Sequence, residues 1–387
     1  MVKAIKVMLI PNNVQKTKMF QYAGASRFAY NWALAREKEN YEKGGKFISD
    51  SELRKEFTKL RHSDEYAWLL SISNNVTKQA IKDACTAYKN FFKGLQKFPR
   101  FKSKKRSMPK FYQDNVKIQF SNTHVKFEGF SSSRKANKQK MNWVRLAEHG
   151  RIPTDVKYMN PRISFDGLNW WISVCVEFPD CRETLNDDGV GIDLGIKDLA
   201  ICSDGTKYKN INKSQKVKKL EKQKRRLQRS ISRSYEKNKK GESYCKTNNV
   251  IKKEKLLLKR NHRLTNIRKN YLNQTISEIV NRKPRFICIE DLNVSGMMKN
   301  RHLSKAVQEQ GFFWFRKQLE YKCSDKGIQL IVADRFYPSS KLCSCCGNIK
   351  KDLKLSDREY RCECGNIIDR DFQASINLKG YGERFAS

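Results

Sequence analysis

Val190-Gly191-Ile192-Asp193 is a short apolar run that ends in a carboxylate, and this stretch decides how the second half of the chain folds. A second run, Phe286-Ile287-Cys288-Ile289, ends in the same way at Glu290. Short apolar runs bounded by turn residues are typical of buried strands. Residues 189–205 are predicted to form a β-hairpin, because turn residues separate the first run from a second apolar segment. Together these patterns predict an α/β domain that begins near Gly189.

The carboxylates at the ends of these runs are candidate metal ligands. Hydrolysis of a phosphodiester at neutral pH requires an activated water and a neutralised leaving group, which two Mg²⁺ ions roughly 3.5–4 Å apart supply. Asp193 and Glu290 occupy strand ends, and a third acid comes from Asp369-Arg370-Asp371. A lone Asp is more often a turn or capping residue. Three acids bordering apolar segments in so basic a chain favour a phosphodiester-cleaving site instead.

Five of the twelve cysteines fall between residues 343 and 364. Cys343-x-x-Cys346-Gly347 and Cys362-x-Cys364-Gly365 have the form of two metal-binding knuckles, although the second pair is one residue short of the usual spacing. Such a cluster in a long basic chain indicates metal ligands in a reducing cytosol. Four thiolates leave no open coordination position, so the predicted Zn²⁺ is structural. Cys345 is a competing ligand.

The charge of the chain indicates its partners. Lys and Arg total 80 and Asp and Glu total 40, which gives a formal net charge of +40 over 387 residues. No ordinary metabolic enzyme needs this surplus, so we expect no small-molecule substrate. Nucleic acid is the favoured polyanion and an acidic membrane surface is the alternative. The sequence contains no long apolar run and no signal peptide, so we expect a cytoplasmic, nucleoid-associated protein with no membrane partner.

The most basic stretch spans residues 207–270. It holds 24 Lys and Arg against 4 Glu, so its charge is 24 − 4 = +20. Apolar spacing predicts two long helices joined by a turn at residues 238–249. A solvated hairpin would mix Glu with Lys at helical spacing, and the single sign therefore favours a surface that faces nucleic acid. The predicted phosphate contacts on the first helix are Lys218, Lys222, Arg225, Arg226 and Arg229.

The first half of the chain has a different pattern. Residues 1–10 alternate like a strand, residues 14–95 have helical spacing, and residues 116–177 are mostly of strand type. In the third segment Val116, Ile118 and Phe120 form one of the alternating runs. This half is therefore predicted to combine α and β parts.

These motifs resemble the TnpB family, the RNA-guided nucleases of insertion sequences and relatives of type V CRISPR effectors. The matching segments are Gly191-Ile192-Asp193-Leu194-Gly195, Ile289-Glu290-Asp291-Leu292, the run from Arg335 to Ser344, and Asp369-Arg370-Asp371. The resemblance implies a RuvC-like RNase H fold with an inserted zinc ribbon, preceded by a β-barrel wedge domain that carries a helical recognition domain. The implied bounds are wedge 1–13 and 99–186, recognition domain 14–98, nuclease domain 187–338 and 369–387, and zinc ribbon 339–368.

The resemblance also implies roles for single residues. It makes Asp193, Glu290 and Asp371 the catalytic Mg²⁺ ligands, and prefers Asp371 to Asp369. Gln373 departs from the family pattern, which often has Asn there. Further nucleic-acid contacts are implied at Arg335, Ser340, Lys341 and Arg370. Candidates for recognising the adjacent motif are Tyr22, Arg27, Tyr30 and Asn31.

The implied function is cleavage of double-stranded DNA beside a short adjacent motif, directed by a guide RNA. Two alternatives share the same residues. A DNA transposase would use the same three acids to join strands, and a nuclease-inactive RNA-guided repressor would only bind DNA. The three intact acids argue against the repressor, because a pure binder has no need for them.

Overall fold

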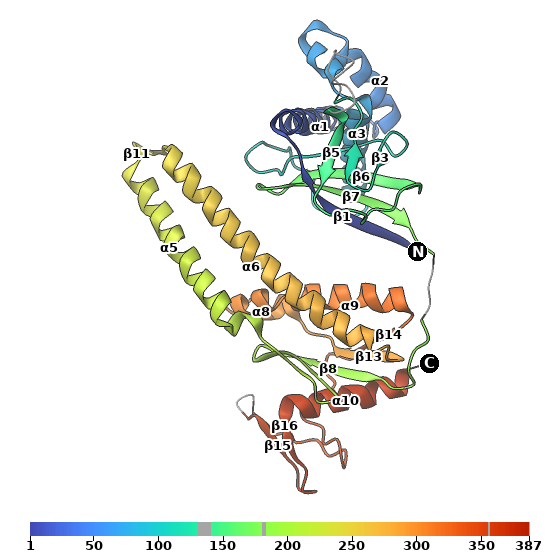
Figure 1. Cartoon of the computed structure of the whole chain (residues 1–387), viewed down its shortest axis with the longest axis vertical. Coiled ribbons are helices and arrows are strands. Elements are labelled where there is room, and N and C mark those ends of the chain that lie inside the picture. Colours follow the sequence, from blue (N-terminus) through green and yellow to red (C-terminus); the bar gives the residue numbers. More distant parts are fainter. Residues whose placement is uncertain (131–140, 180–182, 355–356, 387) are drawn as a thin grey trace. The chain divides into compact units, whose positions relative to one another are not determined.

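The computed structural model describes residues 1–130, 141–179, 183–354 and 357–386, and it divides into two compact units at residues 179/180 (Figure 1). The division falls a few residues before the turn at 186–189 where the sequence places a boundary. The roles of wedge, recognition and nuclease domain stay predictions.

The first unit is built on a seven-stranded antiparallel sheet with the order β2-β6-β7-β1-β5-β4-β3. Its strands are β1 (Val2–Ile10), β2 (Lys110–Tyr112), β3 (Gln119–Phe120), β4 (His124–Lys126), β5 (Trp143–Leu146), β6 (Tyr158–Phe165) and β7 (Trp170–Glu177). The central strand β1 pairs with β7 along its length, and its inward side chains alternate as the sequence predicts. Among the described residues β2 and β3 do not pair with each other. The closed barrel therefore stays a prediction.

The helices of this unit fall within the predicted helical region. They are α1 (Asn13–Glu42), α2 (Asp50–Arg61), the 3₁₀ helix η1 (Asp64–Ser71) and α3 (Asn74–Phe92). Asn12 and Gln15 form a reciprocal capping box that starts α1 directly after β1. The buried side chains of these helices and of the sheet belong to one hydrophobic core.

The predicted strand at Val116 is wrong. Val116 lies in a turn with 87% of its surface exposed. The Asp114 side chain accepts hydrogen bonds from the backbone N–H groups of Val116 and Lys117, at 3.0 and 3.2 Å. This Asx turn outweighs the alternating apolar pattern, because a short Asp side chain offers the backbone a local partner.

The second unit contains a five-stranded mixed sheet with the order β10-β9-β8-β13-β14. Its strands are β8 (Val190–Leu194), β9 (Asp198–Cys202), β10 (Lys207–Lys209), β13 (Phe286–Glu290) and β14 (Gln329–Ala333). β8 and β9 form the predicted antiparallel hairpin, whereas β13 runs parallel to both β8 and β14. The predicted α/β class of this half is therefore confirmed.

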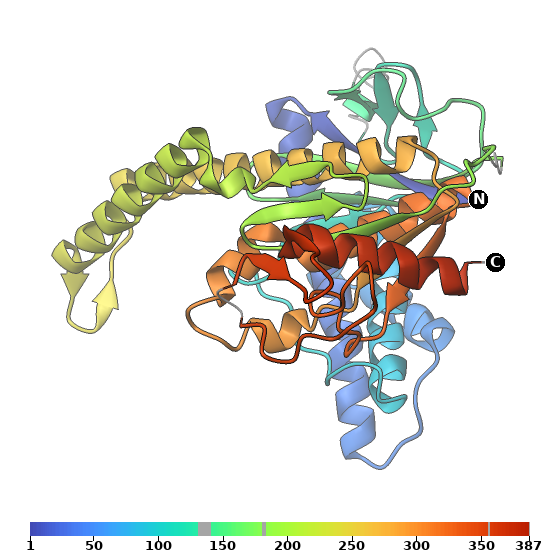
Figure 2. The ribbon, with the colours of Figure 1, turned by 90° about the horizontal axis from the view of Figure 1, so that it is seen from below.

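Helices cover both faces of this sheet. On one face Ile192, Ile287 and Ile289 pack with side chains of α6 (Asn248–Asn281) and α9 (Phe312–Lys326). On the other face Phe286 and Cys288 pack with Leu378 of α10 (Arg370–Phe385). Figure 2 shows α10, in red, lying along its face of the sheet.

The basic stretch forms the predicted helical hairpin. α5 (Gln215–Lys237) and α6 are joined by a small β-hairpin of β11 (Lys239–Lys240) and β12 (Ser243–Tyr244). Val217, Leu220 and Leu264 hold the base of the two helices together. The remaining elements are the 3₁₀ helix η2 (Ile211–Lys213), α7 (Val294–Met297), α8 (Ser304–Gln310), and β15 (Glu359–Arg361) paired with β16 (Ile367–Asp369) beside the cysteines.

Candidate metal centre and nucleic-acid interface

Asp193 and Glu290 lie side by side because their strands run in the same direction. In the parallel pair β8–β13, Gly191 aligns with Cys288 and Ile192 with Ile289. The next residue of each strand is an acid, so both carboxylates emerge at the carboxyl edge of the sheet. Both residues are partly exposed, whereas the residues before them are buried.

Gly191 allows α10 to bring the third acid to this edge. A Cβ on Gly191 would lie 2.1 Å from the Ser375 carbonyl oxygen and 2.3 Å from the Lys379 backbone nitrogen. Backbone of α10 therefore rests directly on β8. Asp193 is on the same face as Gly191, two residues along the strand, and Asp371 is one helical turn before Ser375. The contact thus aligns the first turn of α10 with Asp193.

The structure distinguishes Asp371 from Asp369. Asp369 is the N-cap of α10, and its Oδ1 accepts hydrogen bonds from the backbone N–H groups of Asp371 and Phe372, at 3.2 and 3.0 Å. Its other oxygen lies 3.9 Å from Lys207 Nζ. Asp371 stands in the first helical turn, where the helix dipole favours a carboxylate. Asp369 thus has a capping role, and Asp371 stays the predicted third acid.

The three acids interact electrostatically. Burial and the charges of Glu290 and Asp371 raise the pKa of Asp193 well above its ordinary value, and Arg370 opposes this shift. Burial also raises the pKa of Glu290, with a smaller contribution from Asp371. Carboxylates that repel one another in this way are stabilised by a cation placed between them.

Glu290 is oriented by the segment that follows β14. The Ser339 hydroxyl donates a hydrogen bond to Glu290 Oε1, and Ser339 itself is buried. Asn377 of α10 donates to the Ser339 carbonyl at 2.6 Å and to the Leu342 carbonyl at 2.7 Å. The helix that carries Asp371 thus also fixes the residue that orients Glu290.

Gln373 continues this network to the cysteines. Its side chain is fully buried, and its amide nitrogen donates to the Leu342 carbonyl at 2.6 Å. Its Oε1 accepts from Ser344 Oγ at 3.0 Å and from Asn366 Nδ2 at 3.4 Å, and Asn366 also contacts Cys343 Sγ at 3.5 Å. The departure from the family pattern is therefore accommodated. Sequence reasoning missed this role of Gln373 and Asn377, although polar residues on the buried face of a C-terminal amphipathic helix are a signal for it.

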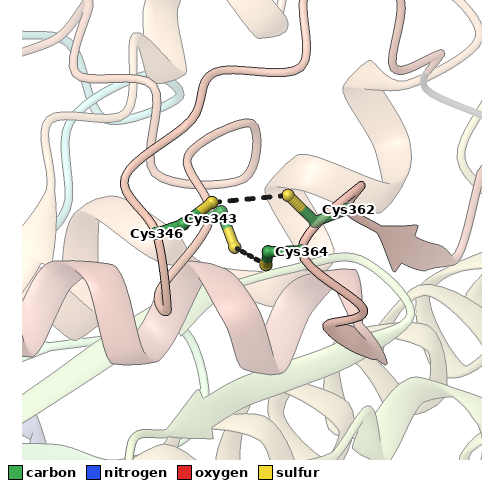
Figure 3. Close-up of side chains that lie close together, drawn as sticks. All are labelled: Cys343, Cys346, Cys362 and Cys364. Atoms are coloured by element: carbon green, nitrogen blue, oxygen red, sulfur yellow. Dashed lines mark hydrogen bonds between the residues drawn. The ribbon is translucent and has the colours of Figure 1, made fainter.

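The four predicted cysteines converge (Figure 3). Among the described residues, only Cys343, Cys346, Cys362 and Cys364 bring potential ligand atoms all within 4.8 Å of one another. Cys345 is exposed and lies outside this group. Gly347 and Gly365, with φ of 75° and 88°, let each knuckle turn back beneath its thiols. The shorter second spacing therefore still closes a four-thiol site, which is the donor set of structural zinc.

The acids are spread more widely than the cysteines, since they do not form such a 4.8 Å group. Carboxylate oxygens are nevertheless the ligands that hard divalent cations prefer.

The five predicted phosphate contacts of α5 share one groove. Lys218, Lys222, Arg225, Arg226 and Arg229 line a cavity of about 610 Å³. Residues of α8 form the opposite wall, with Lys305 and Glu309. Clustered cations in a concave site are suited to a phosphate backbone.

The basic residues near the edge of the sheet that carries the acids have partners within the protein. Arg335 forms ion pairs with Asp291, the neighbour of Glu290, and Arg316 contacts the same carboxylate at 2.8 Å. Arg370 donates to the Lys354 carbonyl at 2.8 Å and to Ser340 Oγ at 3.2 Å, and Lys341 Nζ donates to the Lys351 carbonyl at 3.1 Å. Their nucleic-acid contacts stay predictions. The bonds described here hold the neighbouring segments of the protein in position.

Of the four candidates in the first unit, three have structural partners. Tyr22 is buried and donates to the Glu128 carbonyl. Tyr30 lies beneath Lys102, whose Nζ is 3.0 Å from the ring centroid. Asn31 exchanges two 2.8 Å hydrogen bonds with the Lys102 backbone. Arg27 differs from them, because it lines open cavities.

In the described part of the chain, no helix has the length and apolarity that crossing a membrane requires.

Comparison with known proteins agrees with this architecture. The family model "Probable transposase" matches residues 173–301, "Cas12f1-like, TNB domain" matches 312–378, and "Helix-turn-helix domain" matches 1–46. In this chain residues 1–46 form strand β1 and the single long helix α1. The complex of Cas12f1 with guide RNA and target DNA has a protein chain that aligns with a TM-score of 0.60 at 12% identity, over 98% of both chains.

The fold of this chain is therefore similar to that of the Cas12f1 protein. Two curated relatives are each named a "putative RNA-guided DNA endonuclease". InsQ of Escherichia coli K12 is 31% identical over 93% of this chain and 87% of that protein, and a Streptomyces pristinaespiralis protein is 29% identical over 98% and 89%. The chain belongs to the TnpB family.

Proposed function

We propose that this protein is a Mg²⁺-dependent endonuclease that a guide RNA directs to double-stranded DNA beside a short adjacent motif. The observation that carries the proposal is the meeting of Asp193, Glu290 and Asp371 at one edge of the sheet in a TnpB-family chain. Such cleavage would support maintenance of an insertion sequence. Its place of action would be the nucleoid, where DNA and the newly made guide are both present.

The sheet order supports a RuvC-like RNase H assignment for the second unit. Three antiparallel strands are followed by two parallel ones, and helices cover both faces. We assign the seven-stranded sheet of the first unit to the wedge domain and α1 to α3 to the recognition domain. The two cysteine knuckles together form the ribbon that is inserted before the last helix of the nuclease domain.

The acids fit Mg²⁺ in donor type. Carboxylate oxygens are the hard ligands that Mg²⁺ prefers, and Asp193, Glu290 and Asp371 would hold the ions. When bound, the ions would supply an activated water and neutralise the leaving oxygen. Ser339 holds one oxygen of Glu290 in place, which leaves the other free to face the ion site. Arg370 lies between the acids and the ribbon segment, where it tempers the repulsion among the carboxylates.

The decisive experiment is to purify the protein from cells that also express its flanking element and to sequence the RNA it carries. We expect one defined RNA, and cleavage of DNA that matches its guide segment. Cleavage that keeps its sequence preference after RNase treatment would contradict the guided mechanism.

Asp193→Ala should abolish cleavage while binding of target DNA is kept, and equal cleavage by this variant would contradict the assignment of the acids.

The transposase alternative rests on the family description "Probable transposase". Joined DNA products with no dependence on RNA would favour it. The repressor alternative requires that Asp193→Ala leaves every activity of the protein unchanged.

A further inference from the structure

The first unit contains an aromatic cavity that the proposed chemistry does not use. Its volume is about 790 Å³, and it lies between α1 and η1. Phe28 is one of its lining residues, and its ring centroid lies 5.5 Å from that of Tyr66 and 5.7 Å from that of Trp68. Trp68 and Phe101 are 49% and 54% exposed. Trp68 and Phe101 therefore leave aromatic surface accessible to an occupant.

A second cavity of about 760 Å³ adjoins the first, because both are lined by Gly24 and Arg27. Its wall includes the exposed side chains of Lys104, Lys105 and Arg106. An aromatic recess thus opens beside a run of cations, and α1 forms the border between them.

Arg27 lies at this border and has no partner among the residues that the structure describes. It is half-buried, and within the described ranges no hydrogen bond or ion pair reaches its guanidinium group. An arginine in such a position still has five donors to satisfy. A phosphate is the bidentate acceptor that would satisfy them best.

We propose that these cavities form a subsite for one unpaired nucleotide, with its base among Phe28, Tyr66 and Trp68 and its phosphate on Arg27. Stacking on aromatic rings beside a basic groove is how proteins hold single-stranded nucleic acid with little base preference. The chain's charge of +40 makes a polyanion the favoured ligand over an apolar peptide. The inference rests on the proposed function in taking nucleic acid as the ligand.

Gly24 offers a test that does not disturb the fold. A Cβ at this helical position would meet nothing within 4 Å, so a side chain there extends into the shared opening. Gly24→Glu places a carboxylate three residues before Arg27, where it can pair with the guanidinium and block the phosphate position. Gly24→Ala is the matched control, and both substitutions favour helix over glycine.

The experiment is photo-crosslinking of the full chain carrying Asp193→Ala, freed of copurifying nucleic acid, to 5-iodouracil oligonucleotides of DNA or RNA. Crosslinked residues are mapped by mass spectrometry. We expect crosslinks at Phe28, Tyr66 or Trp68, reduced about tenfold by Gly24→Glu and kept within about twofold by Gly24→Ala. A reduction with only one of the two oligonucleotides identifies that strand as the occupant.

Two results would overturn the subsite. Crosslinks confined to the α5–α6 hairpin would mean that nucleic acid binds elsewhere, and cavity crosslinks unchanged in Gly24→Glu would mean that Arg27 holds no phosphate. In either case the proposed nuclease function stands. Absence of crosslinks throughout the chain would instead contradict nucleic-acid binding itself.

Discussion

At the scale of single residues, the acids of the proposed centre are linked to stability. The raised pKa of Asp193 means that the folded protein holds this proton more tightly than the unfolded chain. Its contribution to stability is therefore present at low pH and is lost as the pH rises through the raised pKa. Above that pKa the buried, ionised Asp193 destabilises the metal-free folded protein electrostatically.

Asp193→Asn should accordingly raise the melting temperature of the metal-free protein at pH 7 to 8. A relief of about 1 kcal/mol corresponds to about 2–4 °C for a unit of this size. The difference should shrink as the pH is lowered through the raised pKa and when Mg²⁺ is added. Calorimetry over a pH series measures it, and a variant that melts lower at every pH would contradict the electrostatic account.

Gln373 links the ribbon to the centre through hydrogen bonds that Asn is one methylene too short to copy in full. Gln373→Leu would remove one of the two side-chain donors to the Leu342 carbonyl, which keeps Asn377, and would remove the acceptor of the Ser344 hydroxyl; it should cost about 1 kcal/mol. We expect a higher Mg²⁺ concentration for half-maximal cleavage, because Leu342, three residues after the Ser339 that contacts Glu290, is held less firmly. Gln373→Asn should fall between Leu and wild type in the same titration. An unchanged Mg²⁺ requirement in Gln373→Leu would rule out the link.

The positions of Asp193 and Glu290 could be predicted from the sequence. The hydrogen bonds that hold the segments around them in place could not. Asp193 and Glu290 each end a local apolar run, which is visible in the sequence. Gln373 and Asn377 act through backbone carbonyls of a segment some thirty residues away, and no local pattern marks such partners.

At the scale of elements, the contact of α10 with β8 depends on the missing side chain of Gly191. Gly191→Ala should push the helix away and cost about 1–3 kcal/mol, with a much larger loss of cleavage because Asp371 moves with the helix. Gly380→Ala in the same helix is the control, since a Cβ there meets nothing within 4 Å. Thermal melts and cleavage rates of the two variants would separate packing from chemistry.

If nucleic acid binds in the α5 groove, the salt dependence of its affinity should change when the groove's cations are removed. Replacing Lys222 and Arg225 by Ala should reduce the slope of log affinity against log salt by about 0.9 for each duplex phosphate that these side chains would neutralise. Lys43→Ala is a suitable control, because this lysine is paired with Glu39 at 2.6 Å. Equal slopes for wild type and both variants would place the nucleic acid elsewhere.

Elements with strong local signals were predictable, including the two helices of the hairpin and the β8–β9 pair. The strand at Val116 was wrong because a side-chain hydrogen bond from one residue, Asp114, replaced the pairing that the pattern indicates. The parallel pairing of β8 with β13 joins segments nearly a hundred residues apart, so only the resemblance to a family suggested it.

At the scale of the whole molecule, loss of metal from the cysteine site should also weaken the proposed cleavage. Cys362→Ser should lower metal occupancy of the ribbon and weaken cleavage, because Asn366 and Gln373 connect the two sites. Cys345→Ser should change neither. Cobalt substitution supplies an independent measurement, since tetrahedral thiolate coordination gives a visible spectrum. Loss of that spectrum in Cys345→Ser would reassign the ligands.

The position of Asp371 on α10 also has a consequence for biosynthesis. Asp193 and Glu290 are translated before Asp371, and the surface of β8 around Gly191 stays uncovered until α10 is translated after the ribbon. Until that helix docks, the nascent chain carries two acids and no complete centre. Any fragment that stops before Arg370 is therefore expected to cleave no DNA. The order of translation would in this way protect the chromosome of the cell from incomplete copies of the protein.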